Sequence, residues 1–206
     1  MSGDWLLDTG SPISFGSEPT IYLDGNRFSI IEDYFGLNSA ELSKLVGEPL
    51  VGLLGMDIIS QLDLMIDIES EILIISHQPI DLDGMILDIE EFMSVPIFRI
   101  RFAECEHRVF FDTGAQISYF QNDSIGNYET AGKVQDFFPG MGEFDTDTYQ
   151  VPFSIGSQEF ELRCGRLPDL LGLTLVTASV EGIIGNEICA GRKLGFFARR
   201  QLLVLA

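Results

Sequence analysis

The chain has 206 residues, of which 46% are hydrophobic and 21% are charged, a balance typical of a globular protein that can bury a full core. It carries 12 lysines and arginines against 32 aspartates and glutamates, which gives a formal net charge of −20. This acidic excess argues against nucleic acid and against an anionic membrane as partners, because both are bound through basic side chains that neutralise phosphates.

The first half of the chain predicts short strands around one Asp-Thr-Gly sequence. Residues 8–15 read DTGSPISF and follow three apolar residues, so Asp8 is expected at the end of a strand. Farther along, a hairpin around an Asp-Gly pair and a brief helix precede the apolar block VGLLG. The expected ranges are a hairpin at 21–30, helices at 39–46 and 56–61, an apolar strand at 51–55 and a closing strand at 71–75.

The second half repeats these features at two fixed offsets. Residues 112–120 read DTGAQISYF, 104 residues after the first copy, and EGIIG at 181–185 lies 130 residues after VGLLG. The second offset holds without a gap to the last strand, where QLLVL at 201–205 matches EILII at 71–75. A repeat of about half the chain predicts two related lobes. The 26 additional residues of the second half lie between its two blocks.

Most of the remaining sequence also favours strands. Hairpin patterns occur at 95–111 and 151–162, and only one further short helix is expected, at 168–171. A stretch with a proline, a glycine and several acidic residues favours a connection between the lobes. The expected division is a first lobe at 1–78, a connection at 79–94 and a second lobe at 95–206.

Two Asp-Thr-Gly sequences offer a chemistry that one does not. A single copy is typical of a tight turn, in which the aspartate bonds its own backbone and the glycine takes a positive φ. Two copies, each followed by an apolar-apolar-Gly block, favour a pair of carboxyl groups, Asp8 and Asp112, brought together by a pseudo-twofold axis. Two carboxyl groups at hydrogen-bond distance share one proton. Such a pair can activate water for attack on an amide carbonyl without a covalent intermediate.

The two D-T-G motifs with their downstream L-L-G and I-I-G blocks resemble those of aspartic proteases of the pepsin and retropepsin group. The resemblance covers residues 5–75 and 95–206. It implies a mainly β protein with two related lobes of double-ψ β-barrel type in one chain and an active site at their junction. It also implies that Asp8 and Asp112 are the catalytic residues.

The resemblance assigns supporting roles to residues around the two aspartates. Thr9 and Thr113 would exchange hydrogen bonds between the lobes and lock the dyad. Gly10 and Gly114 would offer their backbone amides to the carboxylates. The two apolar-apolar-Gly blocks would pass beneath these loops and buttress them.

The residue after each glycine differs between the two copies. Ser11 resembles the pepsin pattern and could donate a hydrogen bond to the outer oxygen of Asp8. Ala115 resembles the retroviral pattern and offers no such bond. On this basis Asp8 is expected to be the carboxyl group that is easier to keep ionised.

Members of the family close over the peptide with a β-hairpin flap. Only residues 16–20 are available for one in the first lobe, which is therefore expected to be minimal and without a flap. In the second lobe, residues 133–151 read as strand, turn and strand, and a single flap is expected there. The alternative is a mobile surface loop over residues 121–149. The flap residues expected at the substrate are Phe138, Gly140, Met141 and Gly142.

The function expected from the resemblance is that of an aspartic endopeptidase acting on extended polypeptides, which bind as a strand. Because both Asp loops belong to one chain, a homodimer is not required for the active site. The alternative is a catalytically weak or inactive protease-like fold that serves as a peptide-binding or scaffolding module, which the short first lobe favours. A serine or cysteine hydrolase is poorly supported, because neither His77 nor His107 accompanies a nucleophile motif.

Cysteine and histidine are scarce in the chain. Three cysteines without a C-x-x-C spacing and two histidines argue against a disulfide scaffold and against a structural zinc site. No metal and no cofactor is expected. The sequence shows no signal peptide and no apolar run long enough to span a bilayer. These features favour a cytoplasmic protein.

Overall fold

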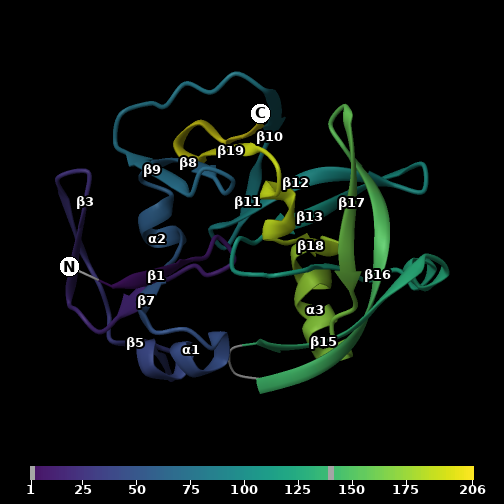
Figure 1. The fold of residues 1–206 in the computed structure, drawn as a ribbon, viewed down its shortest axis with the longest axis horizontal. Coiled ribbons are helices and arrows are strands. Elements are labelled where there is room, and N and C mark those ends of the chain that lie inside the picture. Colours follow the sequence, from purple (N-terminus) through teal and green to yellow (C-terminus); the bar gives the residue numbers. More distant parts are fainter. Residues whose placement is uncertain (1–2, 139–141) are drawn as a thin grey trace.

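The computed structural model describes residues 3–138 and 142–206, and strands dominate it (Figure 1). The strands form sheets of three, five and eight strands and two separate two-stranded hairpins. The helices are short, and none within the described ranges is long and apolar enough to cross a membrane. The chain is a mainly β protein, as predicted.

The first half builds a three-stranded sheet that carries the first Asp-Thr-Gly loop. β1 (Asp4–Leu7) runs parallel to β7 (Leu50–Leu54), and β2 (Phe15–Gly16) pairs antiparallel with the same β7. The neighbouring elements are β3 (Thr20–Leu23) paired with β4 (Asn26–Ser29), β5 (Asp33–Tyr34) paired with β6 (Leu37–Asn38), and α1 (Ser39–Val46). The predicted hairpin at 21–30 and helix at 39–46 are confirmed.

The second half repeats this arrangement inside the eight-stranded sheet. β13 (Cys105–Phe111) runs parallel to β18 (Gly182–Ile184), and β14 (Ser118–Phe120) pairs antiparallel with β18, as β2 does with β7. The sheet order is β11-β12-β13-β18-β14-β17-β16-β15, and one further pairing of β12 with β16 curls the sheet toward a ring. Its other strands are β11 (Glu90–Phe92), β12 (Val95–Phe102), β15 (Glu129–Phe138), β16 (Gly142–Ile155) and β17 (Gln158–Gly165).

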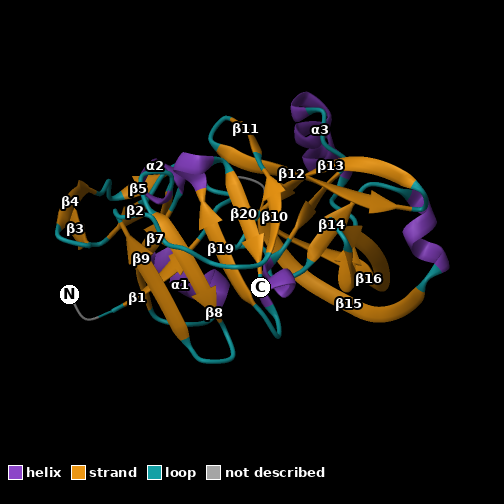
Figure 2. Cartoon of the chain, turned by 90° about the horizontal axis from the view of Figure 1, so that it is seen from above, coloured by secondary structure: helices purple, strands orange, loops and turns teal. Residues whose placement is uncertain are grey.

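A five-stranded sheet joins the two halves, and Figure 2 shows its strands side by side. In spatial order they are β10 (Met85–Asp88), β20 (Leu202–Leu205), β19 (Lys193–Phe197), β8 (Asp63–Asp67) and β9 (Ile72–Ser76). Where β8 and β19 pair antiparallel, Met65 lies opposite Gly195. These two residues are 130 positions apart, which is the offset of the repeat, so the pseudo-twofold axis passes between them.

Part of the stretch expected to connect the lobes, 79–94, forms strands. β10 extends the middle sheet by pairing with β20, and β11 pairs with β12. Ile89 is 8% exposed within the main core, and Met85 and Leu87 pack against that core. Burial of these alternating apolar residues therefore outweighs the acidic composition of the stretch.

Local signals explain where α1 begins and ends. The side chain of Asn38 accepts hydrogen bonds from the backbone N–H groups of Ala40 and Glu41, both at 3.0 Å, which is typical of a helix N-cap. Gly47 follows the helix with φ +82°, a left-handed conformation in which glycine is favoured. Leu42 buries the inner face of the helix.

The other two predicted helices differ from expectation in length. α2 (Met56–Ile59) is shorter than predicted at 56–61, and a 3-10 helix, η2 (Asn186–Cys189), occupies the equivalent place in the second half. α3 (Asp169–Ala178) extends well beyond the predicted 168–171. Its β-branched residues and glycine have low helix propensity, but packing of Leu171 and Leu175 in the core outweighs it. The remaining short helices are η1 (Asp123–Asn127) and η3 (Ala198–Arg200).

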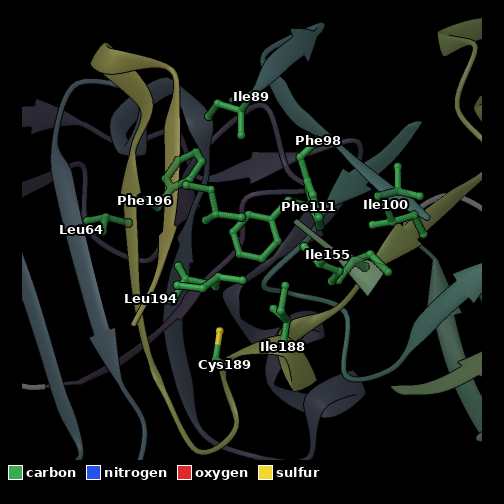
Figure 3. Packing of buried hydrophobic residues seen from close by; sticks show 14 of the residues in the cluster. Leu64, Ile89, Phe98, Ile100, Phe111, Ile155, Ile188, Cys189, Leu194 and Phe196 are labelled. Carbon is green, nitrogen blue, oxygen red and sulfur yellow. The ribbon is translucent and has the colours of Figure 1, made fainter. Parts of the chain in front are cut away.

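One hydrophobic cluster includes residues of the first half, the middle sheet and the second half, and Figure 3 shows part of it. Phe111 of β13 is fully buried, and its ring centroid lies 6.3 Å from that of Phe98 and 5.9 Å from that of Phe196. Burying a phenylalanine side chain stabilises a fold by about 1.5–3 kcal/mol. Because Phe111 immediately precedes Asp112, this packing fixes the strand end from which the second aspartate projects.

Candidate active site

The first Asp-Thr-Gly loop is a tight turn at the end of β1. The backbone N–H of Asp8 donates to the carbonyl oxygen of Leu54 at 3.0 Å, which extends the parallel pairing with β7. The Oδ1 atom of Asp8 accepts hydrogen bonds from the backbone N–H groups of Gly10 at 2.8 Å and Ser11 at 3.0 Å. The loop thus holds the carboxyl group in one orientation.

The second loop reproduces this geometry at the end of β13. The backbone N–H of Asp112 donates to the carbonyl oxygen of Ile184 at 3.0 Å. The Oδ1 atom of Asp112 accepts from the N–H groups of Gly114 at 2.9 Å and Ala115 at 3.2 Å. Both carboxyl groups therefore receive equivalent backbone hydrogen bonds.

Thr9 and Thr113 join the loops by reciprocal hydrogen bonds. The N–H of Thr9 donates to Oγ1 of Thr113 at 3.1 Å, and the N–H of Thr113 donates to Oγ1 of Thr9 at 3.0 Å. Each hydroxyl then donates across the junction, that of Thr9 to the carbonyl of Phe111 at 2.8 Å and that of Thr113 to the carbonyl of Leu7 at 2.7 Å. Both threonines are buried, so these four bonds are shielded from water.

The two carboxyl groups lie close together across the junction, each against the glycine of the other loop. A Cβ atom added to Gly10 would lie 2.3 Å from Oδ2 of Asp112, and one added to Gly114 would lie 2.6 Å from Cγ of Asp8. Because each glycine has no side chain, the carboxyl group of the other loop can occupy the space beside it. No larger residue fits either position without displacing the pair.

Burial and mutual contact change the acidity of both groups. Desolvation, followed by repulsion from Asp112 and a hydrogen bond to it, raises the pKa of Asp8 well above its ordinary value. Desolvation also raises the pKa of Asp112. Two carboxyl groups in such contact titrate as one unit, and a pair of this kind retains one proton under conditions that ionise an isolated aspartate.

The hydroxyl of Ser11 does not have the predicted partner. It donates to the carbonyl oxygen of Ile13 at 2.9 Å, and only the backbone N–H of Ser11 reaches Asp8. The hydroxyl completes the local turn instead of approaching the outer oxygen of the carboxyl group. The predicted difference between Ser11 and Ala115 in stabilising ionised Asp8 therefore has no basis in this geometry.

Two buried serines, which sequence reasoning did not assign a role, support the loops from beneath. Oγ of Ser14 accepts from the N–H of Gly55 at 2.9 Å, and Oγ of Ser118 accepts from the N–H of Gly185 at 3.1 Å. Each bond ties the residues after an Asp-Thr-Gly sequence to the glycine of an apolar-apolar-Gly block. The repeated Ile-Ser pair of the two motifs is the signal that could have identified them.

A cavity of about 590 Å³ opens above the two aspartates. Its walls are mainly apolar and come from both halves, as is typical of pockets that bind organic ligands. From the first half the lining includes Leu6, Phe15, Tyr34, Phe35, Leu37, Leu42 and Leu53. From the second half it includes Tyr119, Asp136, Phe137, Phe138, Phe144, Leu167 and Ile183.

The hairpin predicted at 133–151 is present and longer than expected. β15 and β16 pair from Glu129 opposite Gln150 to Phe138 opposite Gly142. Phe137 packs against the small cluster of Phe15, Leu42 and Leu53 in the first half, so the hairpin reaches across the cavity toward α1 (Figure 1).

Of the four residues predicted at the hairpin tip, two can be placed. Phe138 lines the cavity, whereas Gly142 begins β16 with φ +91° and lies outside the lining. Gly140 and Met141 lie outside the described residues.

Two further residues of the cavity wall had no predicted role. The hydroxyl of Tyr119 donates to Oδ2 of Asp136 on β15. Burial and this hydrogen bond raise the pKa of Tyr119 above its ordinary value. Tyr119 belongs to the second Asp-Thr-Gly motif and Asp136 to the predicted flap, so both lie in segments that the sequence had already marked as functional. The sequence signal for Asp136 is an acidic residue directly before two phenylalanines, in QDFF at 135–138.

The site combines acid–base groups with an apolar cavity. Within the described residues, no group of three or more histidine, cysteine, aspartate or glutamate side chains is placed to hold a metal ion. Comparison of the chain with models of known protein families and with curated proteins finds no match.

Proposed function

We propose that the protein is an aspartic endopeptidase that hydrolyses peptide bonds of extended polypeptides. The observation that carries this proposal is the proximity of Asp8 and Asp112, two carboxyl groups from equivalent loops, each of which lies against the glycine of the other loop at the base of a cavity. Holding two acids together in a buried site is costly. A binding module has no need of such a pair, whereas acid–base hydrolysis does.

The reaction follows from one proton shared by the pair. The ionised carboxylate takes a proton from a water molecule, whose oxygen attacks the carbonyl carbon of the peptide bond. The protonated carboxyl group gives its proton to the carbonyl oxygen, which forms a neutral tetrahedral diol. As the C–N bond breaks, the nitrogen takes the proton held by the first carboxylate, and a hydroxyl proton of the diol returns to the second. One water is consumed and the dyad returns to its initial state.

The proposal includes a fold of two related lobes of double-ψ β-barrel type. It is supported by the matching parallel pairs β1–β7 and β13–β18 and by the gapless offset of 130 residues in the middle sheet. In this reading the β15–β16 hairpin is a single flap that covers the substrate. Because each half supplies one aspartate, the active site is complete within one chain and requires no homodimer.

Amide-for-acid substitution tests the proposal. Cleavage of unfolded casein is measured over a range of pH for the wild-type protein, Asp8→Asn and Asp112→Asn, with and without a statine-type inhibitor. We expect cleavage by the wild type that the inhibitor blocks, and a loss of at least a thousandfold in each variant. Asp145→Asn, an exposed change on β16, is the matched control and should remain active.

The outcome also separates the alternative function. A protein that binds casein peptides but does not cleave them at any pH would be the inactive peptide-binding module. Cleavage that survives in folded Asp8→Asn or Asp112→Asn would show that the dyad is not catalytic. Thermal melting of each variant confirms that it is folded, because removal of one of two opposed acids should not reduce stability.

A further inference from the structure

The two walls of the cavity differ at one pair of equivalent positions. Phe15 and Tyr119 are 104 residues apart, so they occupy the same place in the two copies of the Asp-Thr-Gly motif. Both line the cavity. Phe15 is buried in a hydrophobic cluster with Leu42 and Leu53, whereas Tyr119 directs a hydroxyl group at Asp136. The repeat thus places an apolar group on one side of the dyad and a polar group on the other.

Asp136 has hydrogen-bonding capacity that the protein leaves unused. Its Oδ2 accepts from the hydroxyl of Tyr119, and its Oδ1 accepts from the backbone N–H of Phe137 at 2.7 Å. A carboxylate offers about four acceptor positions. Among the described residues, none of the ion pairs includes Asp136. Its charge is therefore available to a group that enters the cavity.

Asp136 also stands close to the reacting groups. Among the described residues that line the cavity, it is the one acidic residue besides the dyad. The surrounding wall includes Phe144, whose ring centroid lies 6.1 Å from that of Tyr119, and Leu167. A mainly apolar cavity wall that also carries a carboxylate fits a side chain with an aliphatic stem and a cationic end.

We infer that Asp136, oriented by Tyr119, selects a lysine or arginine side chain of the substrate beside the scissile bond. The inference rests on the proposed function and names the substrate class of that site: polypeptides with a basic residue on the Asp112 side of the scissile bond and an apolar residue on the Phe15 side. A cation there satisfies the free acceptor positions of Asp136 and offsets its repulsion with the dyad. The net charge of −20 additionally attracts basic polypeptides.

The test compares peptides that differ at one position. Cleavage of a random peptide library locates the scissile bond, and matched peptides then carry lysine, norleucine or glutamate at the adjacent position. For the wild-type protein we expect kcat/KM to fall in that order, with lysine about tenfold above norleucine, because a hydrogen bond to a charged group discriminates by at least this factor. Equal rates, or a preference for norleucine or glutamate, would overturn the inference.

Substitutions then assign the preference to this residue. Asp136→Asn should bring the lysine-to-norleucine ratio close to one, whereas Asp145→Asn, the same change at an exposed position of the same hairpin, should keep it. Tyr119→Phe should lower the ratio only in part, because the carboxylate remains. If Asp136→Asn slows all peptides equally and leaves the ratio unchanged, Asp136 only positions the hairpin and the inference fails.

Binding separates this inference from the proposed function. Reduced-amide versions of the lysine and norleucine peptides cannot be cleaved, and their affinities are measured by calorimetry. Tighter binding of the lysine peptide to the wild type but not to Asp136→Asn would support the inference even if no peptide were cleaved. No difference in affinity, or no binding of either peptide, would overturn it.

Discussion

The two halves of the molecule match in the loops that carry the dyad and differ in the hairpins around them. At the junction, the Asp8 and Asp112 loops receive the same pair of backbone hydrogen bonds, and Thr9 and Thr113 exchange theirs. Away from the junction, one half carries the long β15–β16 hairpin and the other two short hairpins. Groups that complete each other across an axis must stay equivalent, whereas surfaces that face the cavity or solvent are free to diverge.

The middle sheet shows the same contrast in one pair of residues. Leu73 on β9 and Leu203 on β20 are 130 residues apart and occupy equivalent positions. Leu203 is fully buried within the main hydrophobic cluster, and its strand pairs with β19 on one side and with β10 on the other. Leu73 is 47% exposed, and within the described chain β9 pairs only with β8. The same sequence block is thus an inner, buried strand of the sheet in one copy and an exposed edge strand in the other.

The largest expected effect is at the threonine pair. Thr9→Val or Thr113→Val removes one hydroxyl and leaves a buried N–H and a buried carbonyl without partners, which should destabilise the fold by about 2–6 kcal/mol. Because the two bonds are reciprocal, both substitutions should cost similar amounts. Denaturation by urea measures both values. A marked inequality would show that the junction is not energetically symmetric.

Next is the matched leucine pair of the middle sheet. Leu203→Ala should reduce the free energy of unfolding by about 2–5 kcal/mol, because it empties a filled core position. Leu73→Ala should cost less than about 1 kcal/mol, since much of that side chain is already in contact with water. The two values come from the same denaturation experiment. Equal losses of unfolding free energy would contradict the difference in burial between Leu203 and Leu73.

The dyad should make stability depend on pH. Because burial raises the pKa of Asp8, the folded state keeps a proton that the unfolded state, with a pKa of about 3.9, has released. Stability from this proton is therefore fully present below about pH 3.9 and is lost as pH rises through the folded pKa. Asp8→Asn lacks this loss, so its stability relative to wild type should increase with pH, by about 1.4 kcal/mol for each unit of the shift. Denaturant unfolding of both proteins at pH 4 and pH 7 measures this difference in stability. The same difference at both pH values would contradict the prediction.

The smallest effect distinguishes the two supporting serines. The hydroxyl of Ser14 accepts a hydrogen bond from the N–H of Gly55 and donates one to Oδ1 of Asp57 at 2.5 Å. The hydroxyl of Ser118 accepts a hydrogen bond from the N–H of Gly185. Ser14→Ala should therefore cost about 2 kcal/mol and Ser118→Ala about 1 kcal/mol. Thermal melting of both variants measures the difference. A larger loss for Ser118→Ala would show that the second loop depends more on its serine than the geometry indicates.

Patterns of a few residues were sufficient to predict the strand hairpins at 21–30, 95–111 and 151–162 and the helix at 39–46, because turn residues and caps act locally. The length of α3 was not predictable in the same way. Its own propensity is poor, and it is held by Leu171 and Leu175 against a wall that the sequence does not reveal. The strand β10 was missed for a similar reason, since its partner β20 lies more than 100 residues away.

The sequence by itself determined that the chain repeats and which two aspartates correspond, because the Asp-Thr-Gly and apolar-apolar-Gly motifs recur in the same order at fixed offsets. It also contained Tyr119 and Asp136, but in separate segments with no sign that they meet. Only the tertiary structure decided that contact, the partner of the Ser11 hydroxyl and the different burial of Leu73 and Leu203. Such features depend on which distant strand lies beside each residue, and that choice is made by packing of the whole chain rather than by local preference.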